Sequence, residues 1–183
     1  MLTFNFDTFP VLETERLILK AISMEFVDDI FRQRSKKEVM QYIARPLLQS
    51  KSDAQDLIKN YEFLFEQNIT ISWAIVLKEK SQMIGTVGFP RVNKDNHRGE
   101  VGYSLDTDYW YKGYMNEALK RVLAYGFEEL HFHSIEAMIH PDNKSSSDLV
   151  KKHGFVKEAY FKQYTYFDGK FLDVEVYSLL SKK

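Results

Sequence analysis

The spacing of apolar residues changes several times along this chain, and each change marks an expected element. Apolar side chains alternate over residues 16–22, which is typical of a β-strand. Ser23 then stands where it can cap a helix whose apolar positions, 26, 27, 30 and 31, recur at helical spacing. Residues 52–55 have the sequence of a capping box, and the apolar positions behind them predict a second, longer helix.

From residue 71 the apolar period becomes two, which predicts strands over residues 71–77, 83–89 and 100–105. A helical stripe follows, made by Met115, Ala118, Leu119, Val122, Leu123, Phe127 and Leu130. Alternation returns at residues 135–139 and predicts another strand. Asn143 or Ser145 can cap a short helix, which Gly154 would end in the left-handed conformation. Asp168-Gly169 is a strong hairpin signal between residues 155–167 and 170–180.

The expected order is one strand, two helices, three strands, a helix, a strand, a helix and a hairpin, which indicates an α/β fold. No repeat or linker divides the sequence, so the chain is expected to form a single domain, residues 1–183. A content of 44% hydrophobic and 15% aromatic residues fits a packed core and argues against disorder.

Composition narrows the classes of partner and chemistry. A net charge of −1 gives no broad attraction to nucleic acid or to a membrane surface. The absence of cysteine excludes disulfides, thiolate metal sites and a cysteine nucleophile. The histidines show metal-ligand spacing only at His131-x-His133, which a loop explains, so no metal site is expected. No long apolar run follows Met1, so we expect neither a signal peptide nor a membrane span, and a cytoplasmic protein.

The chain is organised around the stretch that runs from the strand at residues 100–105 through Gly113 into the central helix. A strand that feeds a glycine-bearing turn at a helix start favours phosphate, because the helix N–H groups and the helix dipole both attract an anion. Lys112 would add a positive charge. The alternative is an ordinary helix start, with Gly113 serving the turn and Asn116 facing solvent.

Several runs of residues follow one another in the order of a known family. They are Glu-Val-Gly-Tyr from Glu100, Tyr-Trp-Tyr-Lys-Gly-Tyr-Met-Asn-Glu-Ala from Tyr109, Ile-His-Pro-Asp-Asn from Ile139 and Lys-Lys-His-Gly-Phe from Lys151. Together they resemble the GNAT N-acetyltransferase family, within which they are most similar to the branch that acetylates ribosomal-protein N-termini (RimJ/RimL-like). Residues 12–19 and 168–173 also match that branch, so the resemblance covers nearly the whole chain.

The resemblance implies the acyl-CoA N-acyltransferase fold, a mixed central sheet of about six to seven strands flanked by about four helices and splayed open where acetyl-CoA enters. It also implies direct transfer of the acetyl group from acetyl-CoA to a primary amine in a ternary complex. The implied cofactor-binding residues are Tyr103, Ser104 and Leu105 for the pantetheine arm, Lys112, Gly113, Tyr114, Met115 and Asn116 for the pyrophosphate, and Asn143. Trp110 and Met115 depart from the family pattern, which prefers Arg or Gln and Gly or Ala there.

Two residues are candidates for catalytic proton transfer under this resemblance. Glu100 matches the acidic strand residue that accepts the amine proton in many members; the alternative is an exposed glutamate paired with Lys or Arg. Ser146 lies three residues after Asn143, as in the Asn-x-x-Ser pattern of the ribosomal-protein branch, where the serine assists the departing thiolate. A plain helix-start serine is the alternative. The tyrosine that many members carry at the position of Val150 is absent.

The resemblance favours a protein N-terminal α-amine as acceptor and leaves a small-molecule amine or antibiotic open. A wide acidic cleft would favour a peptide or basic amine, whereas a closed aromatic pocket would favour a small molecule. The competing class is a non-catalytic acyl-CoA-binding module. Exposed edge strands leave a homodimer open, and neither nucleic acid nor membrane is expected as a partner.

Overall fold

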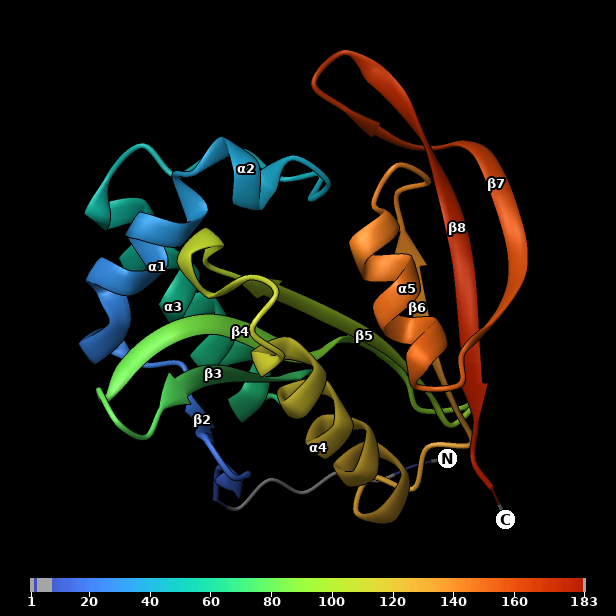
Figure 1. The fold of residues 1–183 in the computed structure, drawn as a ribbon, viewed down its shortest axis with the longest axis horizontal. Helices are drawn as coiled ribbons and strands as arrows, with labels where there is room; N and C mark the ends of the chain where they lie inside the picture. Colours follow the sequence, from blue (N-terminus) through green and yellow to red (C-terminus); the bar gives the residue numbers. More distant parts are fainter. Residues whose placement is uncertain (1, 3–7, 183) are drawn as a thin grey trace.

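The computed structural model describes residue 2 and residues 8–182 (Figure 1). Their strands form one eight-stranded sheet in the order β1-β2-β3-β4-β5-β6-β8-β7. The strands are β1 (Leu12–Glu13), β2 (Leu17–Ala21), β3 (Ile71–Leu77), β4 (Gln82–Asn93), β5 (Arg98–Leu105), β6 (Ser134–Ile139), β7 (Val156–Phe167) and β8 (Lys170–Leu180). The α-helices of the same residues are α1 (Val27–Arg34), α2 (Lys37–Met40), α3 (Lys51–Glu66), α4 (Tyr114–Glu128) and α5 (Lys144–Lys152). The expected α/β order is confirmed, and β1 and α2 are additions because elements so short show no period.

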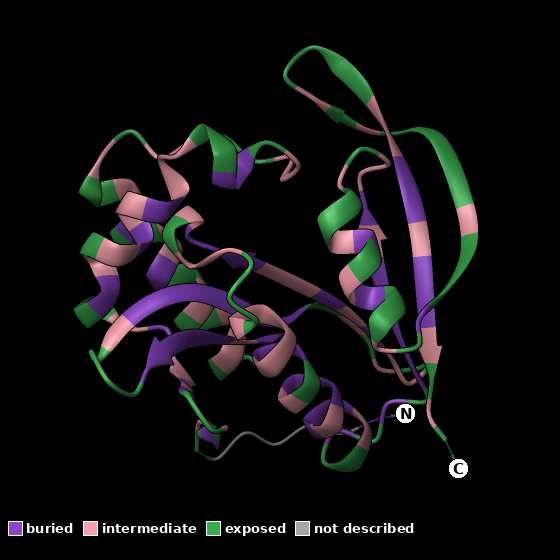
Figure 2. Ribbon diagram, in the orientation of Figure 1, coloured by how far each residue is buried: buried purple, intermediate pink, exposed green. Residues whose placement is uncertain are grey.

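Helices cover both faces of the sheet, and each face has its own core. On one face α1 and α3 pack over the sheet in a cluster that includes Ile30. On the other face α4 packs over the sheet in a larger cluster that includes Leu119. Figure 2 shows that β3 and the first half of β4, which lie between these layers, are almost wholly buried. Trp73 is a core residue of β3, fully buried, and its indole N–H donates to the carbonyl of Pro10 at 2.8 Å.

The sheet opens between β5 and β6, which run parallel. Their register runs from Arg98 opposite Ser134 to Glu100 opposite Glu136, and it ends there. Beyond that pair β5 stays with β4 and β6 stays with β8, so residues 101–105 have no strand partner on the β6 side. Figure 1 shows β5 and β6 diverging, with α5 in front of β6. The open centre implied by the family resemblance is therefore present.

Two helix starts differ from the predicted ones. Ser50 caps α3 by accepting from the N–H of Asp53 at 3.2 Å, and the Asp53 carboxylate accepts from the N–H of Ser50 at 3.0 Å. The predicted capping box at residues 52–55 is therefore wrong; Ser50 and Ser52 both precede the helical period, and the pattern fits either start. Ser23 precedes a 3-10 turn, and its hydroxyl contacts Glu25 instead of a backbone N–H.

The turns of the C-terminal third agree with the predictions. Asn143 caps α5, because its Oδ1 accepts from the N–H of Ser146 at 3.1 Å. Gly154 follows α5 with a φ of +90°. Asp168 and Gly169 have φ of 49° and 76°, and this pair of left-handed residues is the type I′ turn that joins β7 to β8.

Candidate active site

The loop between β5 and α4 holds two residues in the left-handed backbone conformation. Tyr111 has a φ of 58° with its side chain 90% exposed, and Gly113 has a φ of 81°. Left-handed residues among right-handed ones turn backbone N–H groups toward one point and create a concave anion site. In the first turn of α4, the N–H groups of Tyr114, Met115 and Asn116 have no acceptor within the described part of the chain. The loop thus has the geometry of a phosphate cradle.

Arg16 supports this loop from the start of the chain. Its Nη1 donates to the carbonyl of Lys112 at 3.0 Å, and its Nε donates to Glu117 at 2.7 Å. Burial alone would raise the pKa of the Glu117 carboxyl, but hydrogen bonds from Thr14 and Arg16 hold that pKa below its usual range. A Cβ on Gly113 would lie 3.4 Å from Arg16 Nη2. No pattern in the sequence singles out Arg16, although it lies in one of the segments that match the family.

The structure shows side-chain contacts of three residues, in this loop and at the start of α4, that local sequence patterns do not predict. These residues are Trp110, Lys112 and Met115. Lys112 Nζ donates to the carbonyl of Asp108 at 2.7 Å, so its charge lies against the preceding turn. Trp110 is half-buried, and its indole N–H donates to the carbonyl of Leu105 at 2.8 Å. Met115 packs on the α4 core. The two bulky departures from the family pattern are therefore used for packing and for anchoring the loop to β5.

Residues 103–105 lie along the edge of β5 beyond the point where its pairing with β6 ends. The Ser104 hydroxyl is buried and lies 3.1 Å from Thr86 Oγ1, so this side chain is engaged within the sheet. Leu105 is buried in the core on the α4 face. For these two residues a cofactor would meet backbone groups, whereas Tyr103 also presents its side chain toward α5.

Tyr103 joins β5 to α5 across the opening. Its hydroxyl lies 2.8 Å from Ser146 Oγ, and the N–H of Ser146 donates to Asn143. Burial raises the pKa of Tyr103 to about 12, and the hydrogen bond with Ser146 opposes that rise only in part. The phenol therefore keeps its proton throughout the neutral range. Val150 is fully buried, so the tyrosine that stands beside Ser146 comes from β5 and not from α5.

Two carboxylates lie on the opposite face of the same strands. Glu100 faces away from Tyr103, because successive strand side chains alternate, and it is the partner of Glu136 in the last registered pair. Arg91 Nη1 lies 2.8 and 2.7 Å from the two oxygens of Glu100. Arg98 Nη1 lies 3.4 Å from Glu136. Glu100 is thus paired with an arginine, as the alternative interpretation expected, and its role as proton acceptor stays a prediction.

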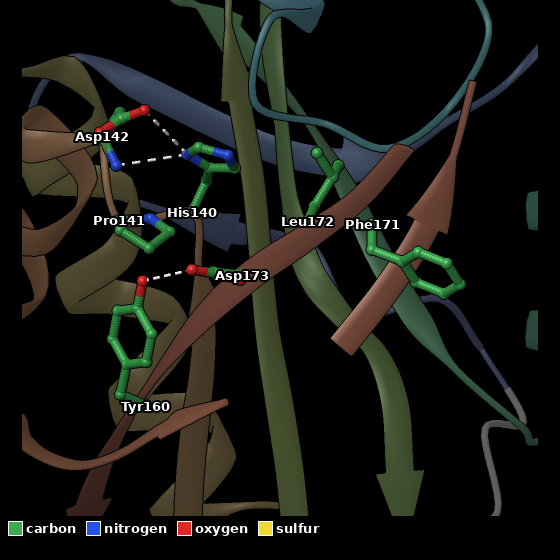
Figure 3. A pocket seen from close by; sticks show the side chains of 7 residues that line it. All are labelled: His140, Pro141, Asp142, Tyr160, Phe171, Leu172 and Asp173. Carbon is green, nitrogen blue, oxygen red and sulfur yellow. Dashed lines mark hydrogen bonds and ion pairs between the residues drawn. The ribbon is translucent and has the colours of Figure 1, made fainter. Parts of the chain in front are cut away.

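A cavity of about 280 Å³ lies beyond the end of β6, against the β7–β8 hairpin (Figure 3). It is lined by His140, Pro141, Asp142, Tyr160, Phe171, Leu172 and Asp173. His140 Nδ1 accepts from the N–H of Asp142 at 3.2 Å, and the Tyr160 hydroxyl donates to Asp173. The His140 ring also stacks on Tyr42, with 5.4 Å between ring centres. His140 is therefore held by neighbours on both sides, as expected of a structural histidine.

A second cavity of about 630 Å³ lies between α2 and the tip of the hairpin. It is lined by Lys37, Met40, Gln41, Arg45, Pro46, Leu47, Gln49, Phe167 and Asp168. Tyr42, which stacks on His140, directly follows a residue of this lining. The Tyr42–His140 contact therefore links the walls of the two cavities.

The loop and the opening fit acetyl-CoA. Asn116 Oδ1 is buried and has no hydrogen-bond partner within the described residues, so a ligand donor would satisfy it. The unpaired N–H groups at the start of α4 suit a pyrophosphate. In residues 2 and 8–182 no group of three or more His, Asp or Glu side chains is arranged to hold a metal ion. No helix in these residues is long and apolar enough to cross a membrane.

Known proteins share both the sequence pattern and the fold. A family model described as "Acetyltransferase (GNAT) domain" matches residues 16–156. The chain is 34% identical over 175 residues to "Uncharacterized N-acetyltransferase YoaA" of Bacillus subtilis, an alignment that covers 96% of this chain and 99% of the relative. It is 36% identical over 96 residues to the ribosomal protein uS5-alanine N-acetyltransferase of Escherichia coli, over 52% of this chain and 50% of the relative.

Two solved structures show how closely the fold is shared. A GNAT-family acetyltransferase from Bacillus anthracis has a TM-score of 0.83 at 24% identity, over 93% of this chain and 98% of that chain. The apo form of RimL, a ribosomal L7/L12 α-N-protein acetyltransferase, has a TM-score of 0.85 at 18% identity, over 99% of this chain and all of that chain.

Proposed function

The chain belongs to the GNAT acetyltransferase family, and from this premise we propose that it acetylates a protein N-terminal α-amine with acetyl-CoA as the donor. The observation that carries the acceptor class is the pair of cavities along the β7–β8 hairpin. A compact amine needs one closed pocket. Two cavities linked at the Tyr42–His140 contact suit an extended chain, and Asp142 and Asp173 make the smaller cavity acidic.

The donor side of the site is formed by backbone groups. When bound, acetyl-CoA supplies an acetyl group activated as a thioester. The N–H groups at the start of α4 would hold the pyrophosphate, and Gly113 would allow close approach. Lys112 would add charge only from the preceding turn, where its Nζ donates to the carbonyl of Asp108. Backbone groups of residues 103–105 and the Asn143 side chain would hold the pantetheine arm.

The two proton transfers, from the acceptor ammonium and to the departing sulfur, would occur on opposite faces of the opening. An ammonium acceptor must lose a proton before it can attack, and one of the two carboxylates at the opening, Glu100 or Glu136, would accept that proton. Glu136 lies on β6, and the smaller cavity begins at His140, just beyond the end of that strand. On the other face Ser146, with the Tyr103 hydroxyl beside it, would assist the departing sulfur. Holding amine and thioester in line would contribute about 7–11 kcal/mol.

The names of the relatives agree with an N-terminal acceptor but differ in detail. The Escherichia coli relative is named for acetylating an alanine of ribosomal protein uS5, and RimL for acetylating the α-amine of ribosomal L7/L12. The Bacillus subtilis relative that spans the whole chain carries no acceptor in its name. The acceptors named for these two relatives share one chemical group, the α-amine of a protein residue.

A thiol assay tests the acceptor class directly. The chain contains no cysteine, so a thiol-reactive dye would report only the CoA released by transfer. Peptides that begin with Ala or Ser would be compared with their N-terminally blocked forms and with spermidine, a small polyamine. We expect free peptides to be acetylated and blocked peptides to be inert. Faster turnover of spermidine would overturn the peptide assignment, and acetyl-CoA binding without turnover of any amine would favour a non-catalytic module.

Two further expectations stay predictions. Light scattering during size-exclusion chromatography would show whether the protein is a homodimer. Fractionation of cells that express it would show whether it is cytoplasmic.

A further inference from the structure

Glu136 lies at the point where the sheet opens, although the sequence analysis did not single it out. It is the β6 partner of Glu100 in the last registered pair of the two strands. Partners in adjacent strands lie about 4.8 Å apart, and their side chains share a face of the sheet. The two carboxylates therefore stand side by side. Like charges this close disfavour ionisation of both, so one of the two takes up a proton more readily than an isolated carboxylate does.

The two carboxylates have unequal counter-charges. Arg91 Nη1 lies within 2.8 Å of both oxygens of Glu100, whose side chain is only 12% exposed. Arg98 lies 3.4 Å from Glu136, and its Nε donates instead to the hydroxyl of Ser134 at 2.9 Å. The Glu136 side chain is 25% exposed. Arg91 thus compensates the charge of Glu100 closely, whereas the charge of Glu136 is less compensated and more accessible.

Some of the other charged groups that face Glu136 raise its pKa, and others lower it. Burial raises the pKa of Glu136, and the negative charges of Glu100 on β5 and Glu158 on β7 add to the rise. Arg98 on β5 and Arg91 on β4 oppose it, and the net direction is upward. A general base works best when its pKa lies near the working pH. This direction agrees with the geometry of the pair.

We propose that Glu136 is the catalytic residue that takes the proton of the acceptor ammonium, and that Glu100, paired with Arg91, is a positioning residue that sets the proton affinity of Glu136. The assignment rests on the proposed function and refines it. In this step an N–H bond of the ammonium breaks, its electron pair stays on nitrogen, and the proton bonds to a Glu136 oxygen. The products are a neutral amine and a neutral carboxyl group, which returns its proton to water through its exposed edge.

The pH dependence of peptide acetylation separates the two roles. With the Ala-initiated peptide, Glu136→Gln should lower kcat/KM about 100-fold at pH 7 and approach the wild type at high pH, where the free amine is abundant. Glu100→Gln removes the neighbouring negative charge, so the acid limb of kcat/KM should move to lower pH. Glu158→Gln, an exposed carboxylate on the same face, should shift that limb less than Glu100→Gln. A wild-type rate for Glu136→Gln would overturn the assignment.

A titration of the free protein decides the pairing without any acceptor. The carboxyl carbon signal of Glu136, in protein labelled with ¹³C-glutamate, is identified by its loss in Glu136→Gln. The midpoint of the Glu136 titration should lie above the usual glutamate range. This midpoint should move to lower pH in Glu100→Gln and to higher pH in Arg91→Met. The Arg91 side chain is 65% exposed in the wild type. These shifts would support the coupling of Glu136 with Glu100 even if no peptide is acetylated. A failure to acetylate peptides would count only against the proposed acceptor. Titration of Glu136 in the usual range, unmoved by either variant, would overturn the inference.

Discussion

The Ser146 hydroxyl lies 2.8 Å from the Tyr103 hydroxyl and ties helix α5 to strand β5 across the open centre of the sheet. Because burial raises the pKa of Tyr103 to about 12, the phenol is protonated at every pH at which the enzyme would work. A phenol that donates to Ser146 Oγ leaves the serine proton free to point at a third group in the opening. In the proposed mechanism this contact would leave the Ser146 proton available to the departing sulfur.

Ser146→Ala should lower kcat about 100-fold, which is the lower end of the range for a positioned proton donor. The dissociation constant of acetyl-CoA, measured by calorimetry, should stay within about twofold, because the cradle at Gly113 is untouched. Ser145 is exposed and adjacent in sequence, so Ser145→Ala is the matched control and should keep the wild-type kcat. Equal losses in the two variants would show that Ser146 acts only as part of the helix start.

Arg16→Gln should weaken acetyl-CoA binding about tenfold, equivalent to 1.4 kcal/mol, because the loop loses its support. The variant removes the donors to Glu117 and to the carbonyl of Lys112, which together hold the loop at the start of α4. Lys78→Gln is the matched control, since Lys78 is a surface cation paired with Glu13 at 3.0 Å. Calorimetry of both variants in low salt is the measurement. An equal loss for Lys78→Gln would assign the effect to net charge and not to the loop.

The sequence predicts those parts of the fold and site that local chemistry determines. Gly113, Asn143 and the Asp168-Gly169 turn each act on the backbone of their own turn, so their residue types reveal the geometry. The longer helices and strands show a period for the same reason. The start of α3 could not be fixed, because Ser50 and Ser52 satisfy the same local pattern.

The missing parts of the site depend on contacts between distant segments. Arg16 reaches Lys112 and Glu117 across 96 and 101 positions, and no local pattern marks such a contact. Glu136 becomes a partner of Glu100 only through the parallel register of β5 and β6, which are connected through α4. Tyr111 adopts a positive φ that its residue type disfavours.

Asp106→Asn should destabilise the protein by about 3 kcal/mol at pH 7, because it leaves two cations without their buried partner. The Asp106 side chain is fully buried, and its oxygens lie 2.6 Å from Lys36 Nζ and 3.0 Å from Arg32 Nε. These contacts attach the end of α1 and the start of α2 to the end of β5. Asp28→Asn is the control, since Asp28 and its partner Lys51 are both exposed and such pairs contribute roughly 0–1 kcal/mol. Urea unfolding of the three proteins is the measurement.

The same variant predicts how stability depends on pH. Burial alone would raise the pKa of Asp106, but hydrogen bonds from Lys36 and Arg32 hold it below the usual aspartate range. A carboxyl group with a lowered folded-state pKa stabilises the protein above its unfolded pKa, near pH 4. That stabilisation is lost as the pH falls through the folded-state value. The gap in unfolding free energy between wild type and Asp106→Asn should therefore shrink between pH 4 and lower pH, and a constant gap would contradict the assignment.

Gly113→Ala should affect stability and cofactor binding together, whereas Gly169→Ala should affect stability alone. Gly113 and Gly169 have φ of 81° and 76°, so an alanine at either position costs about 1–2 kcal/mol of unfolding free energy for the left-handed conformation. A Cβ at Gly169 meets nothing within 4 Å, but a Cβ at Gly113 lies 3.4 Å from Arg16 Nη2, in the loop that would receive the pyrophosphate. Gly113→Ala should therefore raise the acetyl-CoA dissociation constant at least about tenfold in calorimetry, while Gly169→Ala keeps the wild-type value. Similar binding by both variants, with similar losses of stability, would mean that the left-handed glycine serves the fold of the turn and that the phosphate cradle lies elsewhere.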